Sequence, residues 1–260
     1  MSFKSWLSYS DFSENACSKL RYILDNESSE FLNSINDTCS DRVKTLKVGS
    51  VVWRAQTGCG EEKASDNVEQ EFHVDKRIPF PFERMKPLTN SASEGRANSK
   101  GIPCLYVAAD AETAIHEVRP WPGLTLTIAQ LHLTKDVKLI DFSETADAEQ
   151  YPYFFFGEPS INQRIDAVWA AMDIAFSWPV TGSDSKSEYV PTQIISEFIK
   201  SKGYDGIIYK SSLTKGRNYV LFNLNDAAVV QCDLFVVSKA KFDFEKLDGS
   251  SSLTAERGNT

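Results

Sequence analysis

Apolar residues recur at helical spacing in the second half of the chain. Over residues 160–176 they fall on one side of a predicted helix, and Ser160 can cap its N-terminus. A further helix is expected to begin at Pro191, where a fixed φ suits the first helical turn, and to end at Gly203. We interpret the apolar stripe over residues 160–176 as part of the core and not as a cofactor site.

The N-terminal segment shows the same period less regularly. Two helices are expected within residues 10–46, with one apolar stripe running from Phe12 to Ile23 or Leu24 and a second from Phe31 to Val43. No residue in this segment resembles a site. We therefore predict a helical N-terminal extension over residues 1–46 that serves packing or binds a partner.

Runs rich in β-branched and aromatic residues predict a set of strands. These runs occupy residues 48–55, 102–107, 124–133, 136–142, 205–212, 216–224 and 228–243. In the third run the apolar parity switches near Ile128 and Ala129, which indicates a bulge or burial on both faces.

Together these elements predict an α+β fold in which helices pack on a mixed β-sheet. The chain shows no internal repeat and no linker, so one domain is expected over residues 47–247.

Residues 56–101 lack strong periodicity. The first half, GCGEEKASDNVEQEF, has the composition of a mobile excursion, whereas Phe80 and Phe82 allow the second half to dock. Residues 248–260 are expected to form a disordered tail.

Composition narrows the class of protein. The 260 residues carry a net charge of −8, which argues against a nucleic-acid binder because such proteins need a basic face. No apolar run reaches the roughly 18–20 residues of a membrane span, and the first ten residues lack a signal-peptide core. Five scattered cysteines and three histidines, without C-x-x-C or H-x-x-x-H, give little support to a metal site. We expect a reduced, cytoplasmic protein with neither a membrane nor a nucleic acid as partner.

The stretch GRANSKGIPCLYVAADAETAIHEVRP contains the strongest candidate chemistry. It predicts a loop, a strand and a short helix that Asp110 caps and Pro120 prevents from continuing. Glu117 then lies in the last helical turn, where a cation would suit the helix dipole better than a carboxylate does. Arg96, Tyr106 and Glu117 can converge around one strand end. A solvated surface role is the ordinary alternative for Arg96 and Glu117, and a core role is the alternative for Tyr106.

Arg54 stands at the end of the first predicted strand, beside three apolar residues. A guanidinium is costly to bury there unless it has an anionic partner. A structural salt bridge would supply that partner, and so would a ligand phosphate held by the planar fork of Arg54.

Three separated blocks together resemble the RES domain family, which is named for an Arg, a Glu and a Ser. VVWRAQ places the family Arg at Arg54. The block from FERMKP through GRANSKGIPCLYVAADAETAIHE places a second Arg at Arg96, the Tyr at Tyr106 and the Glu at Glu117.

The third block is EYVPTQIISEFIKSKGYDGIIYKSSLTKGRNYVLF, which places the Ser at Ser211 and an Asn at Asn218. The neighbouring Ser212 is an alternative, and the place of Ser211 after Tyr209 favours Ser211. The resemblance covers about residues 48–224 and does not extend to the N-terminal extension.

The resemblance implies an ADP-ribosyltransferase-like fold that consumes NAD as a substrate, without a separate cofactor. Many members of the family are bacterial toxins paired with an Xre-type helix-turn-helix antitoxin. Some degrade NAD by phosphorolysis or hydrolysis, and others modify a protein.

These activities assign roles to the matching residues. Glu117 would stabilise the oxocarbenium-like sugar that forms when nicotinamide leaves. Arg54 and Arg96 would hold the pyrophosphate or an incoming inorganic phosphate. Tyr106 would stack on a ring of the ligand. Ser211 and Asn218 would bond ribose hydroxyls or the amide.

Three functional hypotheses follow: an NAD phosphorylase or hydrolase, an ADP-ribosyltransferase acting on a protein, and a catalytically silent domain that binds a nucleotide or partner. The complete Arg, Glu and Ser set favours the first two over the third. No G-x-G-x-x-G follows a strand, which argues against a dehydrogenase of Rossmann type.

Overall fold

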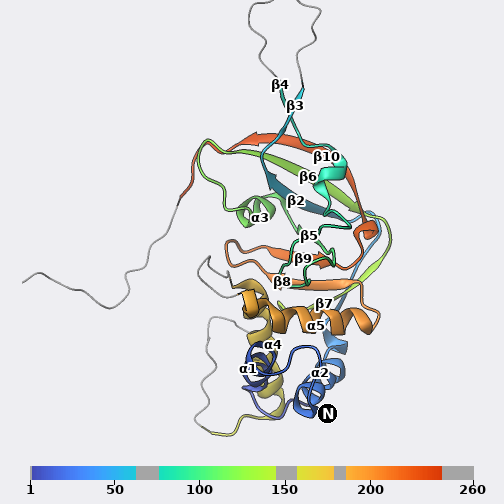
Figure 1. Ribbon diagram of the computed structural model, residues 1–260, viewed down its shortest axis with the longest axis vertical. Helices are drawn as coiled ribbons and strands as arrows, with labels where there is room; N and C mark the ends of the chain where they lie inside the picture. Colours follow the sequence, from blue (N-terminus) through green and yellow to red (C-terminus); the bar gives the residue numbers. More distant parts are fainter. Residues whose placement is uncertain (1, 63–75, 145–156, 179–185, 242–260) are drawn as a thin grey trace, which may run out of the picture.

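A computed structural model describes residues 2–62, 76–144, 157–178 and 186–241. Its centre is one eight-stranded mixed sheet in the order β1-β7-β8-β9-β5-β2-β6-β10, with β7 and β8 parallel and the other neighbours antiparallel (Figure 1). The strands of this sheet are β1 (Val43–Leu46), β2 (Val51–Thr57), β5 (Leu105–Ala108), β6 (Thr125–Leu133), β7 (Val137–Asp141), β8 (Gly206–Lys210), β9 (Arg217–Leu221) and β10 (Ala227–Val236). The predicted α+β class with a mixed sheet is confirmed.

Four of the five helices described gather at the end of the molecule next to β7 and β8 (Figure 1). They are α1 (Ser8–Ser18), α2 (Asn26–Thr38), α4 (Ile161–Ser177) and α5 (Val190–Ser201). The fifth, α3 (Ala111–Glu117), lies apart from them and contacts β2. Short 3₁₀ turns occupy Ser40–Arg42, Phe82–Met85, Lys186–Tyr189 and Leu224–Asp226.

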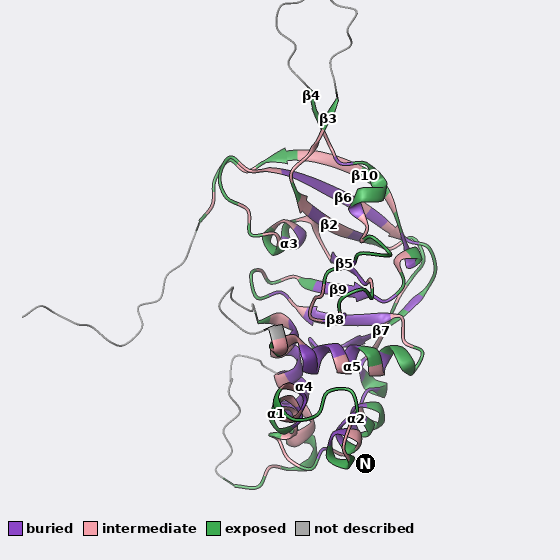
Figure 2. Ribbon diagram, in the orientation of Figure 1, coloured by how far each residue is buried: buried purple, intermediate pink, exposed green. Residues whose placement is uncertain are grey.

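The predicted helices in the second half form where the sequence places them. Ser160 caps α4 in a capping box with Gln163, which satisfies two backbone N–H groups at the helix start. Pro191 lies in the first turn of α5, and Gly203 follows the helix at φ +87°, a conformation that glycine adopts without steric cost. Trp169 and other apolar side chains of α4 are fully buried against the sheet (Figure 2).

The N-terminal prediction is partly wrong. Two helices do form, but Val43 is not on a helix: it begins β1, which pairs antiparallel with β7 at the edge of the main sheet. The first helix ends at Ser18, and Ile23 beyond it is 79% exposed, so the expected stripe does not continue that far. Asp25 starts the second helix by accepting a hydrogen bond from the backbone N–H of Ser28.

The strand over 124–133 is buried along most of its length on both faces. The irregularity near its middle lies in the partner strand β10, where the register shifts between Val229 and Gln231. Burial on both faces, the second of the two predicted alternatives, therefore accounts for the change of parity in β6.

A two-stranded hairpin, β3 (Gly60–Glu62) with β4 (Lys76–Ile78), projects from the sheet (Figure 1). The predicted mobile excursion falls largely between these strands, over residues 63–75, and lies outside the described residues. The predicted tail over residues 248–260 also lies outside them. Phe80, in the segment predicted to dock, is buried.

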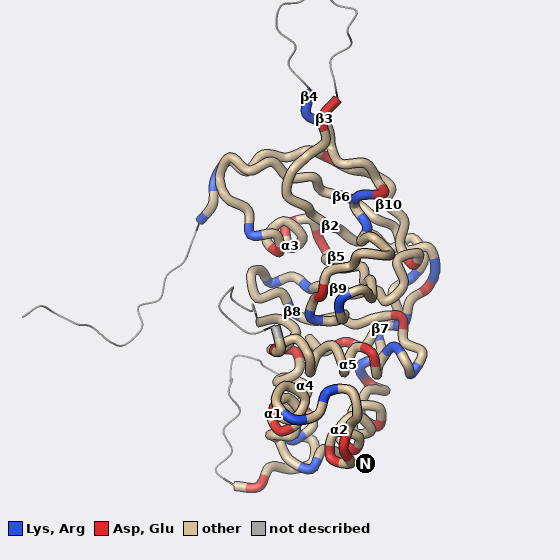
Figure 3. The backbone as a smooth tube through the Cα atoms, viewed as in Figure 1, with Lys and Arg blue, Asp and Glu red and all other residues tan. Residues whose placement is uncertain are grey.

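Acidic and basic residues are interspersed along the described helices and strands (Figure 3). No helix in the described part of the chain is both long enough and apolar enough to cross a bilayer.

One irregularity of the sheet decides where the site lies. β2 and β5 are neighbours, yet only one residue pair, Trp53 with Ala108, joins them. On its other side β2 pairs with β6 along its whole length, from Val51 to Thr57. The sheet is therefore nearly split between β2 and β5, and the two strands diverge from a single point of contact.

Candidate active site

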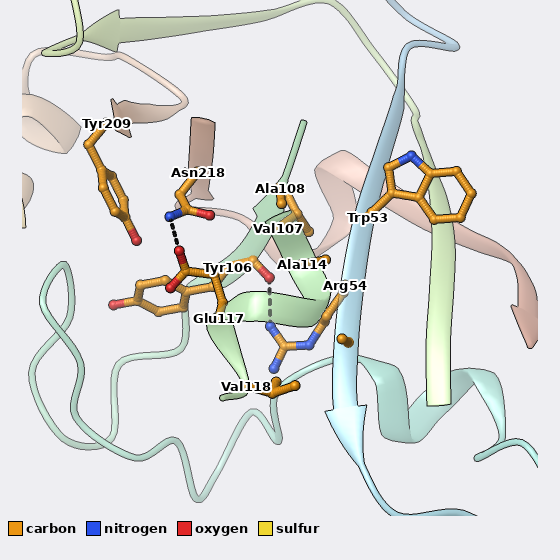
Figure 4. Close-up of a pocket in the computed structure, with 11 residues that line it drawn as sticks. Trp53, Arg54, Tyr106, Val107, Ala108, Ala114, Glu117, Val118, Tyr209 and Asn218 are labelled. Carbon is orange, nitrogen blue, oxygen red and sulfur yellow. Dashed lines mark hydrogen bonds between the residues drawn. The ribbon is translucent and has the colours of Figure 1, made fainter. Parts of the chain in front are cut away.

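A cavity of about 270 Å³ opens where β2 and β5 diverge. Each strand contributes three consecutive residues to its wall, and α3 with the residue after it, β8 and β9 supply the rest (Figure 4). The lining residues are Trp53, Arg54, Ala55, Tyr106, Val107, Ala108, Ala114, Glu117, Val118, Tyr209 and Asn218.

Glu117 projects into this cavity from the last turn of α3. Asp110 fixes the start of that helix by accepting a 2.7 Å hydrogen bond from the backbone N–H of Thr113. After Glu117 the chain turns sharply, and Arg119 adopts φ +47°, which is uncommon for a residue other than glycine. The helix therefore stops where the sequence predicts, with the carboxylate at its C-terminal end.

Two side chains hold the Glu117 carboxylate at one oxygen. Ser211 Oγ donates to Oε1 at 2.8 Å. Asn218 Nδ2 donates to the same atom at 2.7 Å, as Figure 4 shows. The two bonds together fix the orientation of the carboxylate in the cavity. No hydrogen bond from the described residues reaches Oε2, so that oxygen remains available to a ligand.

Local packing explains how Ser211 and Asn218 reach Glu117. Asn218 lies opposite Tyr209 in the β8–β9 pair, and Ser211 follows β8 directly. In the turn between these strands a Cβ atom on Gly216 would lie 1.9 Å from Oγ1 of Thr113, so only glycine lets the turn pack this closely on α3. The sequence left Ser211 and Ser212 as alternatives. Ser211 is buried and bonded to Glu117, whereas Ser212 is exposed.

Arg54 faces the cavity from β2. Its Nη1 donates to the backbone carbonyl of Tyr106 at 2.8 Å and so bridges the split between β2 and β5 (Figure 4). Its Nε is buried without a hydrogen-bond partner among the described residues. Burial lowers the pKa of Arg54, but a guanidinium stays charged at neutral pH.

The salt bridge considered for Arg54 from the sequence is absent from the described part of the chain, where no carboxylate pairs with it. A half-buried cation whose fork is only partly used is suited to an anionic ligand.

Tyr106 contributes its ring to the cavity wall, but its hydroxyl is committed elsewhere. The hydroxyl donates to Oδ1 of Asn98 at 2.7 Å and accepts from the backbone N–H of Ala97 at 2.9 Å. Asn98 in turn donates to three backbone carbonyls of the same loop. Burial raises the pKa of Tyr106, so the hydroxyl stays protonated and anchors the loop that contains Arg96.

Arg96 is not among the residues that line the cavity. Its Nη1 donates to the carbonyl of Phe176, in the last turn of α4, at 2.7 Å. The structure thus brings Arg54, Tyr106, Glu117, Ser211 and Asn218 together. Arg96 is directed to the end of α4 and does not line the cavity. The sequence predicted that Arg96 could converge with Tyr106 and Glu117; its charge acts on Tyr106, but Arg96 does not line the cavity that Glu117 enters.

Tyr209 was not predicted as a site residue, although it lines the cavity. It occupies an almost entirely apolar strand, GIIYK, and this sequence context predicts a residue of the hydrophobic core. The sequence feature that could have identified Tyr209 is its distance from Ser211. Residues two apart on a strand share a face, and Ser211 lies two residues after Tyr209. Trp53 also lines the cavity, on the side of β2 opposite Arg54 (Figure 4).

The described residues contain no group of three or more His, Cys, Asp or Glu side chains that could hold a metal ion. What the cavity offers is a carboxylate with one free oxygen, a guanidinium with unused donors, and aromatic walls. This arrangement suits a ligand that carries anionic groups and develops positive charge at one carbon.

Comparison with known proteins gives one family match. The model of the RES domain matches residues 74–245, a range that includes Glu117 and Ser211 but begins after Arg54. Among solved structures, a chain of the M. tuberculosis MbcT–MbcA toxin–antitoxin complex is similar with a TM-score of 0.38 and 11% identity, over 76% of this chain and 90% of that one. No curated protein matches significantly.

Proposed function

The chain belongs to the RES domain family, and on that basis we propose that it cleaves NAD at the bond between nicotinamide and ribose. NAD is then a substrate and not a resident cofactor. The nucleophile that replaces nicotinamide is small, either inorganic phosphate or water.

The observation that carries the proposal is the setting of Glu117. Nicotinamide leaves as a neutral base and takes the electrons of the C–N bond, so positive charge develops on the ribose. A carboxylate fixed beside that carbon stabilises the charge, as carboxylates do in glycoside hydrolysis. Ser211 and Asn218 both donate to one oxygen of Glu117, which fixes the carboxylate and leaves its other oxygen to face the sugar.

This assigns Ser211 and Asn218 a different task from the one expected from the sequence. Their donors are used on Glu117, so they act on the carboxylate and not directly on ribose hydroxyls. The hydroxyl oxygen of Ser211 also accepts from the backbone N–H of Leu213 at 3.2 Å, which further fixes its direction.

Arg54 supplies the anion-binding part of the proposal. It is the guanidinium on the cavity wall among the described residues, and its Nε has no partner there. The pyrophosphate of NAD would take these unused donors. The ring of Tyr106 provides a flat apolar surface for nicotinamide.

The reaction is balanced with either nucleophile. With phosphate, a phosphate oxygen forms the new bond to the ribose carbon, and the products are nicotinamide and ADP-ribose phosphorylated at that carbon. With water, the products are nicotinamide, ADP-ribose and a proton.

The proposal extends to a toxin role with an Xre-type helix-turn-helix antitoxin as partner. The support for this part is the family alone.

The test is incubation of the purified protein with NAD, with and without inorganic phosphate and with no other acceptor, followed by chromatography of the products. We expect free nicotinamide from the parent protein and a loss of roughly a hundredfold or more in rate for Glu117→Gln. Glu112→Gln is the matched control, because Glu112 is an exposed glutamate in the first turn of the same helix. A parent protein that leaves NAD intact would refute the proposal. Near-parental turnover by folded Glu117→Gln would refute the role of Glu117.

A further inference from the structure

We propose that Tyr209 donates a hydrogen bond to the ribose hydroxyl next to the reacting carbon, and that Arg96 positions Tyr209 for this task. The inference rests on the proposed function. It adds a substrate-contacting residue and gives Arg96 a role other than phosphate binding.

The position of Tyr209 is the first step. Only 4% of its surface is exposed, yet it lines the cavity. It pairs with Asn218 across the β8–β9 ladder, and Asn218 bonds Glu117. Figure 4 shows the ring extending from β8 toward the interior of the cavity, with its hydroxyl on the side of Glu117 and Tyr106.

Phe176, at the end of α4, packs against this ring, and Arg96 bonds Phe176. The ring centroids of Phe176 and Tyr209 are 5.9 Å apart, and Arg96 Nη1 binds the Phe176 carbonyl at 2.7 Å. Gln193 Nε2 ties the loop that contains Arg96 to α5 by donating to the carbonyls of Gly95 and Asn98, at 2.9 and 3.1 Å. Arg96 is therefore fixed at both its backbone and its guanidinium.

The chemistry of these groups sets the direction of the phenol proton. A guanidinium has only donors, so any hydrogen bond between Arg96 and Tyr209 is donated to the phenol oxygen. A phenol oxygen that accepts a hydrogen bond is free to direct its own proton into the cavity, where the Tyr209 hydroxyl lies on the side of Glu117 (Figure 4).

The hydroxyl remains a donor at all ordinary pH values. Burial raises the pKa of Tyr209, and the negative charge of Glu117 raises it further, whereas the charge of Arg96 and a hydrogen bond from it act in the opposite direction. The balance keeps the phenol neutral and protonated.

A ribose hydroxyl fits between these two groups because it is both donor and acceptor. Its proton can go to the free oxygen of Glu117 while its oxygen accepts from Tyr209. This pair of contacts would place the adjacent reacting carbon beside the carboxylate, which is the alignment that catalysis requires.

The experiment compares two substrates in each variant: NAD, and the NAD analogue that lacks the 2′-hydroxyl of the nicotinamide ribose. With NAD, Tyr209→Phe should lower kcat/KM on the order of tenfold, the effect of one lost hydrogen bond. With the analogue, Tyr209→Phe should act like the parent protein. Tyr219→Phe is the matched control, since Tyr219 lies on the adjacent strand and packs into the core on the other face of the sheet.

A second pair of variants tests Arg96. If Arg96 acts through Tyr209, Arg96→Gln loses activity on its own but adds little to Tyr209→Phe in the double variant. Additive losses, together with a raised requirement for phosphate in Arg96→Gln, would overturn the positioning role.

The substrate ratio separates this inference from a folding defect, because damaged packing lowers turnover of both substrates equally. Equal losses on NAD and the analogue in Tyr209→Phe would overturn the inference and leave the proposed function standing. A parent protein that does not cleave NAD would overturn both.

Discussion

Arg54→Met is the most informative single change in this protein. It removes the guanidinium but keeps an apolar side chain of similar length between β2 and β5. The sequence left two explanations for Arg54, a structural contact and a ligand clamp, and this substitution affects stability and binding to different extents under each.

Two opposed effects determine the change in stability without ligand. The bond from Nη1 to the Tyr106 carbonyl is lost, and a hydrogen bond from a charged donor contributes about 1.5–3 kcal/mol. The substitution also removes the buried Nε, which has no partner among the described residues, and such an unsatisfied group costs about 1–3 kcal/mol. These values nearly cancel, so we expect the free energy of unfolding to change by about 1 kcal/mol, which is about 2–4 °C in Tm.

The effect on NAD binding should be larger, because nothing offsets it. Removing one partner of a buried, hydrogen-bonded charge pair costs about 2–5 kcal/mol. At about 1.4 kcal/mol for each factor of ten, the Kd for NAD should rise by at least about 30-fold. Arg54→Lys should fall between the parent and Arg54→Met, since an ammonium keeps the charge but loses the planar fork.

The assay is isothermal titration calorimetry with NAD in a Glu117→Gln background, which slows turnover by roughly a hundredfold or more. Thermal unfolding followed by circular dichroism is measured alongside it. Arg84→Met is the matched control, because the Arg84 guanidinium stacks on Phe80 and does not line the cavity. An unchanged Kd for NAD with a fall in Tm above about 10 °C would refute the clamp. Arg54 would then serve to join β2 to β5.

Three further predictions follow from the site and its supports. Ser211→Ala should lower NAD turnover in a product assay about tenfold or more, whereas Ser212→Ala should match the parent; equal losses would remove Ser211 from the site. Gly216→Ala should reduce both Tm and turnover, because the added Cβ overlaps Thr113, and a parental Tm would contradict that packing. Burial raises the pKa of the Asp173 carboxyl, so ionisation of Asp173 lowers the stability of the folded protein above the ordinary carboxyl pKa. Asp173→Asn should therefore raise Tm near pH 7, where the parent carboxyl is driven to ionise, and leave it unchanged near about pH 3. A rise in Tm at about pH 3 and none at pH 7 would refute this assignment.

Elements with a local determinant could be predicted from the sequence. Ser160 and the apolar period define α4, and Asp110 and Pro120 define the short helix that ends at Glu117. These signals act within a few residues of the element they specify, so no knowledge of the tertiary structure is needed.

Features that depend on distant partners could not be predicted in the same way. Val43 continues an apolar pattern that suits a helix, and it becomes a strand residue because β7 offers an unpaired edge. Arg96 occupies a polar loop that suits a ligand contact, but the end of α4, some 80 residues away in sequence, accepts its hydrogen bond. Tyr209 has the sequence context of a core residue and lines the cavity because β5 and β2 separate beside it.

The split between β2 and β5 links these observations. A sheet paired continuously at this position would satisfy the Tyr106 carbonyl with a backbone N–H and would leave no space for a ligand. Here the carbonyl is satisfied by Arg54, a side chain that also presents unused donors to the cavity. The contact that stabilises the open sheet is therefore made by the same group that would bind the substrate anion. Because Glu117 is anchored from the β8–β9 side and Arg54 from the β2 side, the two groups reach a common ligand only across this gap.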